Sequence, residues 1–415
     1  MEAPPETCTL IGPFAQVVTM ANLPLTGPIT DDQLEILEHA GVLVQADKIV
    51  RVGPYAQLAR EAESHSYQLH PIDQPLVLLP GLIDAHTHLC FAGSRSNDYA
   101  LRVAGKTYLE IARQGGGILD TVRKTRAASP EELVQTLTQR CSRHLAEGVT
   151  TCEVKSGYGL TVPDELKMLE AISQVNQQHP LDLVPTCLAA HTRPREFAEN
   201  TAYLRHVVQE HLPQVKEKAL AYRVDIFIED TAFSEEEALW FLQEAKAQGF
   251  QITVHADQFS TGGSKVAAQV EALSADHLEA STPQELLLLK EAGVVATVLP
   301  GASLGLGIAF APARKMLDQG LCVAIATDWN PGSAPMGDLL VQASLLGAAQ
   351  KLTIAETFAG VTTRAAHALR LEDRGSLEAG MLADMIAFPT SNYQEIPYFQ
   401  GKLKPTMVWK NGKLV

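Results

Sequence analysis

Short apolar runs that end in polar residues recur along the middle of the chain, and an amphipathic stretch with helical spacing follows each of them. Eight of these runs are predicted to be strands: 77–88, 150–156, 181–191, 224–230, 250–257, 272–278, 294–300 and 321–328. Strands that are apolar almost throughout are typical of a parallel sheet covered by helices. Eight strand–helix units in series predict an α/β fold, the (β/α)8 TIM barrel, rather than a doubly wound sheet.

The intervening stretches carry the usual start and stop signals of helices. The stretch 129–148 opens with Ser129 as the expected N-cap and Pro130 at the first helical position, and it ends at Gly148. The stretch 234–249 likewise opens with a serine, Ser234, and ends at a glycine, Gly249. These stretches are therefore predicted to form part of the outer ring of helices.

Both ends of the chain depart from this rhythm. Residues 1–77 contain two short apolar runs around a polar turn, and residues 378–415 contain the pair Asn411–Gly412, which is typical of a β-hairpin. We expect the two ends to join into one small β-sandwich domain. The barrel is then expected to span residues 78–377.

Composition and charge narrow the class of protein. Of the 415 residues, 46% are hydrophobic and 20% are charged, which is ordinary for a soluble globular protein. The net charge of −15 disfavours nucleic acids and anionic membranes as partners, because both select a basic surface. No apolar run is long enough to span a membrane, and the first residues do not resemble a signal peptide. The six scattered cysteines indicate reduced, buried thiols. We expect a cytoplasmic protein that acts on a small molecule.

Polar side chains with metal-binding and proton-transfer chemistry follow several of the predicted strands. In barrels of this type the active site lies at the carboxyl ends of the strands. The side chains found at those ends are His86, His88, His191, His255, His277 and Asp328. Five imidazoles and one carboxylate are therefore predicted to converge on one rim of the barrel.

Four of these side chains form a plausible metal site. His86 and His88 are two residues apart in a strand, so their side chains share a face. With His255 and Asp328 they offer three nitrogens and one oxygen, a set that suits zinc and that iron tolerates. A bound metal can lower the pKa of a water ligand toward neutrality. The water proton then needs an acceptor, and Asp328 and His277 are placed for that role.

The sequence around these residues resembles the amidohydrolase superfamily, through PGLIDAHTH, HAD, SADH and ATD at the predicted strand ends. The longer motifs EVKSGYGL and ATDWNPGS are similar to those of the imidazolonepropionases. This resemblance implies that a metal-bound hydroxide hydrolyses the ring amide of 4-imidazolone-5-propanoate to N-formimidoyl-L-glutamate, in histidine degradation, and that the enzyme is a homodimer. No lysine ends the fourth strand, where two-metal relatives carry a carboxylated one, so one Zn2+ or Fe3+ ion per chain is expected.

The resemblance also implies a set of substrate-binding residues. Arg95 is expected to bind the propionate, and its guanidinium can give a carboxylate two parallel hydrogen bonds. The side chains and backbone expected to line the rest of the pocket are Tyr158, His191, Asn330, Gly332 and Ser333.

One position departs from the pattern. The residue three places after His255 is often a glutamate in single-metal relatives, where it moves protons, but here it is Gln258. An amide cannot act as a general base. We keep Gln258 among the catalytic candidates with His277 and Asp328. Either Gln258 only hydrogen-bonds the substrate, or the substrate differs from the one that the resemblance implies.

Two other functions stay open on the sequence. The first is another single-metal amidohydrolase, such as a deaminase of a purine, pyrimidine or guanidine compound. KSGYG and Arg95 favour a small acid over a nucleobase. The second is a scaffold without activity, which would be expected to have lost metal ligands, whereas all four are present.

Overall fold

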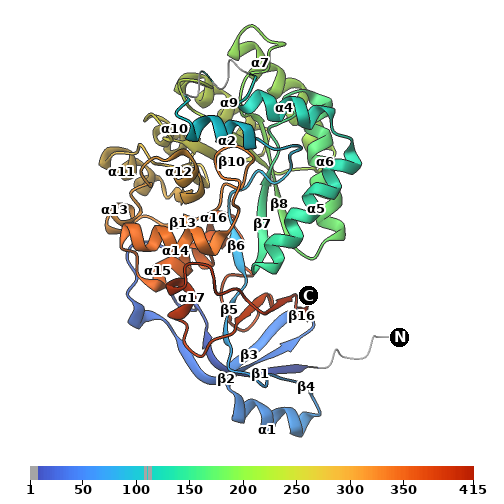
Figure 1. Ribbon diagram of the computed structural model, residues 1–415, viewed down its shortest axis with the longest axis vertical. Coiled ribbons are helices and arrows are strands. Elements are labelled where there is room, and N and C mark those ends of the chain that lie inside the picture. The colour runs from blue at the N-terminus through green and yellow to red at the C-terminus, as the bar shows by residue number, and fades with distance from the viewer. Residues whose placement is uncertain (1–7, 107–109, 111–114) are drawn as a thin grey trace.

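The structure is a computed structural model that describes residues 8–106, 110 and 115–415. Its larger part is a barrel of strands ringed by helices, and below it in Figure 1 lies a sheet built from the two ends of the chain. Strands near the N-terminus and strands near the C-terminus lie side by side in that sheet. The predicted fold class, a TIM barrel with an additional β unit made from both ends, is confirmed.

The barrel consists of eight parallel strands in chain order. They are β6 Leu82–Asp84, β7 Val149–Lys155, β8 Asp182–Ala190, β9 Arg223–Ile226, β10 Gln251–Ala256, β11 Ser274–His277, β12 Val295–Val298 and β13 Val323–Ile325. Each of the eight predicted runs overlaps one of them, and β7 and β9 begin one residue before the predicted run. The first and last strands meet where Thr87 forms a bridge with Trp329, beyond the ends of β6 and β13.

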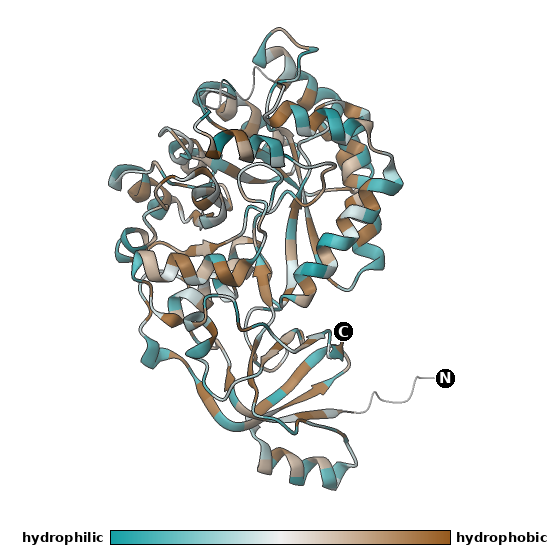
Figure 2. Ribbon diagram, viewed as in Figure 1, coloured by the Kyte–Doolittle hydropathy of each residue, from teal (hydrophilic) through white to brown (hydrophobic). Residues whose placement is uncertain are grey.

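Helices cover the outside of the barrel. The longer ones are α4 Ile118–Ala127, α5 Pro130–Ala146, α6 Val162–Gln178, α9 Glu235–Ala247, α11 Pro283–Ala292 and α14 Leu339–Gln350, and shorter ones include α2 Ser96–Val103, α7 Asn200–His206, α10 Gly263–Gln269, α12 Pro300–Leu306, α13 Ala313–Asp318, α15 Ile354–Gly360 and α16 Thr363–Ala368. Figure 2 shows apolar strands inside and mixed, amphipathic helices around them. The Ser129 side chain accepts a hydrogen bond from the Glu132 backbone and completes a capping box, as predicted.

The additional sheet joins the two chain ends. Its strands are β1 Thr9–Val18, β2 Ile36–Gln45, β3 Lys48–Pro54, β4 Gln68–Pro71, β5 Val77–Pro80, β14 Met385–Phe388, β15 Met407–Lys410 and β16 Lys413–Leu414. Strand β5 pairs with β1 on one side and with β14 on the other, which ties the ends together. Asn411 and Gly412 both have positive φ and make the tight turn of the predicted hairpin. Helix α1 Tyr55–His65 packs on β1 and β2, and α17 Glu395–Tyr398 packs against α14.

The predicted strand 77–88 is in fact two strands. Residues 77–80 pair within the terminal sheet, and the chain then turns at Gly81 into β6 of the barrel. The expected division between residues 77 and 78 therefore falls inside β5. Gly81 donates its backbone N–H to the Asp384 carbonyl at 2.9 Å. A Cβ at this position would lie 2.2 Å from Oγ1 of Thr150, so only glycine fits.

Two expectations from composition can be compared with the fold. All six cysteines are buried free thiols. No helix among the described residues is long and apolar enough to cross a membrane.

We predict that Gly81→Ala destabilises the fold by about 1–3 kcal/mol, because its Cβ forces Thr150 and the start of the barrel apart. Gly53→Ala is the matched control, since a Cβ there meets nothing within 4 Å. Adding Thr150→Ala to Gly81→Ala is expected to restore part of the loss. Urea unfolding measures all three, and equal stability of the two single variants would contradict the close approach.

Candidate active site with a metal centre

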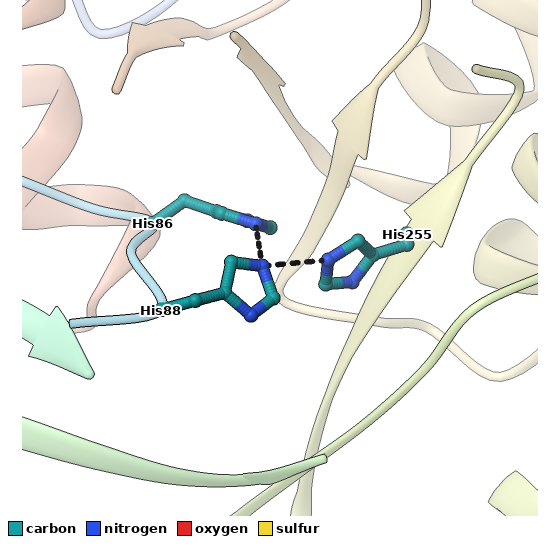
Figure 3. Close-up of side chains that lie close together, drawn as sticks. All are labelled: His86, His88 and His255. Carbon is teal, nitrogen blue, oxygen red and sulfur yellow. Dashed lines mark hydrogen bonds between the residues drawn. The ribbon is translucent and has the colours of Figure 1, made fainter. Parts of the chain in front are cut away.

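Three imidazoles meet at the carboxyl end of the barrel strands. His86 and His88 follow β6, and His255 lies on β10, as Figure 3 shows. Nε2 of His88 lies 3.3 Å from Nε2 of His86 and 3.3 Å from Nε2 of His255. Oδ1 of Asp328 lies 3.3 Å from Nε2 of His88 and 3.6 Å from Nε2 of His86. The four residues predicted as ligands thus form one buried group.

Backbone pairing between the first and last strands sets this arrangement. His88 donates its backbone N–H to the Trp329 carbonyl at 3.0 Å, and Asp328 donates its own to the His86 carbonyl at 3.0 Å. These two backbone hydrogen bonds place Asp328 beside His86 and His88. Asp328 has a φ of 52°, a left-handed conformation that is uncommon for a residue with a side chain. Such strain is found where the surrounding structure holds a functional group in place.

The other ring nitrogens of His86 and His255 face carboxylates below the site. Nδ1 of His86 and Oδ2 of Asp276 are hydrogen-bonded at 2.7 Å. Nδ1 of His255 lies 2.9 Å from Oδ2 of Asp225. Burial lowers the pKa of both histidines, which keeps the rings neutral. A neutral ring that carries its proton on Nδ1 presents a lone pair at Nε2, the form in which histidine binds metals.

These observations fit a bound cation. The Nε2 atoms of the three rings lie close enough together to be bound by one cation, which would accept a lone pair from each neutral imidazole. Burial also raises the pKa of Asp328, so that its ionised form depends on a nearby positive charge. Three nitrogens and one carboxylate oxygen are a typical set for a single divalent metal ion.

A second group, Asp84, His144 and Cys152, also lies close together. The two carboxylate oxygens of Asp84 accept hydrogen bonds from the Thr327 backbone N–H at 2.9 Å and from its hydroxyl at 2.6 Å. Nε2 of His144 lies 3.1 Å from the same carboxylate. Burial, and then the charge of Asp84, raises the pKa of the Cys152 thiol well above its usual range, so it is a poor ligand. We interpret this group as a polar link between α5 and the barrel.

A cavity of about 580 Å3 opens above the histidine cluster. His86 lies beneath it and is fully buried. The other residues predicted for the site all line it, and they are His88, Arg95, Tyr158, His191, His255, Gln258, His277, Asp328, Asn330, Gly332 and Ser333. The structure therefore brings the whole predicted set to one place.

His277 lies at the end of β11 in a strained conformation, with a φ of 90°, and Leu278 follows with a φ of 70°. The ring centroid of His277 is 5.4 Å from that of His255. Nδ1 of His277 lies 3.6 Å from Oε2 of Glu279, whose other oxygen accepts a hydrogen bond from Ser303. Burial lowers the pKa of His277, but Glu279 outweighs this effect and the pKa is raised. His277 can therefore hold a proton near neutral pH.

Arg95 lines the wall of the same cavity. Its Nε donates to Oδ2 of Asp98 at 2.8 Å, and the same oxygen accepts the backbone N–H of Gly117 at 2.8 Å. A Cβ at Gly332 would lie 2.3 Å from Nη1 of Arg95, so glycine makes room for the guanidinium. Arg102, which the sequence did not single out, lines the same cavity.

Asn330 and Gln258 lie on loops that are anchored by hydrogen bonds from side chains to the loop backbone. The Asn330 side-chain oxygen accepts the backbone N–H groups of Gly332 and Ser333 at 2.7 and 2.8 Å, so this amide shapes its own loop. The residues after Gln258 are held by Glu229, whose Oε1 accepts the backbone N–H of Phe259 at 2.7 Å. Gln258 itself lines the cavity with its amide.

Several functional neighbours were not predicted from the sequence. Asp225 contacts His255 and Asp276 contacts His86, both candidate metal ligands, and Lys155 lies between the two aspartates. Lys155 ends β7, Asp225 lies in β9 and Asp276 lies in β11, and the sequence of a parallel strand does not show which positions point inward. The only available signal was a charged residue within each apolar run.

Comparison with known proteins agrees with this geometry. The family described as the amidohydrolase family matches residues 77–415. The imidazolonepropionase of Bacillus cytotoxicus is 44% identical over 384 residues, covering 92% of this chain and 90% of that protein. The imidazolonepropionase of Alkaliphilus metalliredigens is 40% identical over 413 residues, covering 98% and 97%.

Solved structures share the fold at lower sequence identity. A triazine hydrolase from Arthobacter aurescens superposes with a TM-score of 0.74 at 18% identity, covering 99% of this chain and 94% of that one. An adenosine deaminase from Xanthomonas campestris with bound zinc superposes with a TM-score of 0.69 at 20% identity, covering 99% and 93%.

We predict that Glu279→Gln lowers the pKa of His277, because the carboxylate that raises it is removed. A raised folded-state pKa means that protonated His277 stabilises the fold. This contribution is complete below the unfolded pKa of about 6.5 and is lost as the pH rises through the folded value. NMR titration of the ring protons in the zinc-loaded protein measures the shift. An unchanged pKa in the variant would show that Glu279 does not set it.

Proposed function

Because the chain belongs to the amidohydrolase family, and within it to the imidazolonepropionases, we propose that it hydrolyses the ring amide of 4-imidazolone-5-propanoate to N-formimidoyl-L-glutamate. The observation that carries this proposal is one cavity with His86, His88, His255 and Asp328 at its floor and Arg95 on its wall. The floor suits hydrolysis, and the wall suits a substrate with a carboxylate.

We propose that Arg95 binds the propionate of the substrate. Asp98 holds Nε of Arg95, and the rest of the guanidinium can give the carboxylate two hydrogen bonds. Tyr158 and His191 pack together with ring centroids 5.4 Å apart and form the wall on which the planar imidazolone ring can lie. The ring amide is thereby directed toward the floor of the cavity.

The metal in this proposal is one zinc or iron ion held by His86, His88, His255 and Asp328. When bound, it supplies Lewis acidity for activating water and the scissile carbonyl. Asp328 accepts the proton of the attacking water and returns it to the ring nitrogen that leaves when the C–N bond breaks. His277, whose proton Glu279 supports, donates to the oxygen that gains negative charge. Gln258 positions the substrate by hydrogen bonding.

The direct test is turnover. Formation of N-formimidoyl-L-glutamate from 4-imidazolone-5-propanoate is measured beside ammonia release from purine, pyrimidine and guanidine amines. The proposal expects the first activity alone. Ammonia release from an amine, with no turnover of the imidazolone, would assign the chain to the deaminases instead. The homodimer and the cytoplasmic location stay predictions.

For the metal centre, we predict about one transition-metal ion per chain and loss of both metal and activity in His86→Ala. Cys152→Ser is the matched control, since the Asp84 group is expected to bind no metal. Elemental analysis of the purified proteins measures this. Loss of metal in Cys152→Ser with retention in His86→Ala would place the ion at the other group.

For the substrate carboxylate, we predict that Arg95→Lys raises KM strongly while kcat changes less, because charge is kept but the two-pronged geometry is lost. Gly332→Ala is expected to act in the same direction, since its Cβ displaces the Arg95 guanidinium. Steady-state kinetics distinguish the two constants. A KM equal to that of the wild type in both variants would mean that the carboxylate is held elsewhere.

For proton transfer, we predict that His277→Ala lowers kcat by about two to four powers of ten with the metal still bound. Gln258→Ala is expected to cost less, because only a hydrogen bond is lost, and Gln258→Glu should leave measurable activity. The comparison is made at equal metal content. If Gln258→Ala proves as damaging as His277→Ala, the assignment of proton transfer is wrong.

A further inference from the structure

A fully buried lysine stands inside the barrel beneath the histidine cluster. Lys155 ends β7, and its side chain has no exposed surface. Its Nζ lies 2.8 Å from Oε1 of Glu153, 2.8 Å from Oδ2 of Asp225 and 3.8 Å from Oδ2 of Asp276. One ammonium group therefore faces three buried carboxylates.

Two of these carboxylate oxygens are shared with the metal-binding histidines. Oδ2 of Asp225, which contacts Lys155, also lies 2.9 Å from Nδ1 of His255. Oδ2 of Asp276 accepts the Nδ1 hydrogen bond of His86 at 2.7 Å. Two short chains, each from lysine through aspartate to histidine, thus lead from one ammonium to two of the three imidazoles.

We propose that Lys155 is a positioning residue for the metal centre. Its ammonium fixes the carboxylates of Asp225 and Asp276, and through them it orients the rings of His255 and His86. This inference rests on the proposed metal site, because it explains how that site is held in the geometry that binds an ion.

The two chains do not depend on Lys155 equally. Oδ1 of Asp225 accepts the backbone N–H groups of Ile226 at 2.7 Å and of His255 at 3.1 Å, so this carboxylate has other anchors. Asp276 has fewer anchors in the described part of the chain: besides His86 and the ammonium of Lys155, its carboxylate contacts the side chain of Ser274. Because Asp276 has fewer other anchors than Asp225, its orientation depends more on Lys155. Loss of Lys155 is therefore expected to change the orientation of the His86 ring first.

The lysine itself is firmly held. Glu153, which also accepts the hydroxyl of Thr186 at 2.5 Å, anchors the ammonium. The Lys155 backbone N–H donates to the carbonyl of Thr87 at 3.0 Å, the residue between the two histidines of the pair. Burial lowers the pKa of Lys155, but Asp225 and Glu153 outweigh it and raise the pKa, which keeps the ammonium charged.

A purely electrostatic role for Lys155 makes the opposite prediction. If the lysine only offset negative charge, its removal would leave the region more negative, and a metal cation would bind more tightly. If it positions the carboxylates, its removal lets them repel and turn away, and the metal binds more weakly. The sign of the change in metal affinity separates these roles.

The experiment measures zinc affinity by chelator competition in Lys155→Met and in the wild type. We expect affinity to fall by about 10- to 100-fold, the usual size of a lost partner of a metal ligand. The visible spectrum of the cobalt(II)-substituted protein should also change, since it reports ligand geometry. The matched control is Lys410→Met, which removes another buried lysine with two carboxylate partners, Asp182 and Asp384, in the terminal sheet. It should leave zinc affinity and the cobalt spectrum unchanged.

A second variant keeps the test decisive if Lys155→Met does not fold. Lys155→Met combined with Glu153→Gln removes one positive and one negative charge together, yet still leaves Asp276 without its ammonium. It is expected to bind zinc more weakly as well. Zinc affinity equal to or above that of the wild type in a folded variant would overturn the proposal. Failure of the wild-type chain to bind zinc would instead count against the proposed metal site.

Discussion

The structure depends on keeping charges paired inside the barrel. Glu153, Lys155, Asp225 and Asp276 stand where aliphatic side chains usually fill a barrel of this type. Removing such groups from water costs several kcal/mol per ion, and this cost is offset only when each has close partners. The partners available are one another and the histidines above them, so the interior charges and the metal-binding rings are held together as one unit.

This unit lies at and just beyond the ends of the barrel strands, whereas several of the residues proposed to bind the substrate lie on loops. The strands fix the nitrogen atoms that must converge within a few ångströms. The loops carry Arg95, Gln258 and Asn330, and a side chain anchors the loop in each case. Asp98 holds Arg95, Glu229 from the segment after β9 holds the residues after Gln258, and the Asn330 amide holds its own loop. Such anchored loops can differ between relatives without disturbing the floor of the cavity, which is consistent with one fold being shared by proteins of different activity.

The sequence predicted the barrel and the convergence of the candidate metal ligands, because each of the three histidines follows or ends an apolar run and strand ends share one rim. It could not show the carboxylates beneath. The positions of Asp225 in β9 and Asp276 in β11 do not reveal from the sequence that these side chains point inward. Nor could it divide the run 77–88, because the break at Gly81 depends on Thr150 from another strand. Asn330 was predicted as a substrate contact, but its amide is largely used within its own loop, a role that only three-dimensional contacts reveal.

The most direct test of the central claim is a crystal structure of the zinc-loaded protein with anomalous diffraction at the zinc edge. We expect one strong peak within about 2.0–2.2 Å of Nε2 of His86, His88 and His255 and of a carboxylate oxygen of Asp328. The Nδ1 atoms of His86 and His255 should keep their contacts to Asp276 and Asp225. A peak at Asp84, His144 and Cys152 instead, or histidine rings turned away from those two aspartates, would contradict the account.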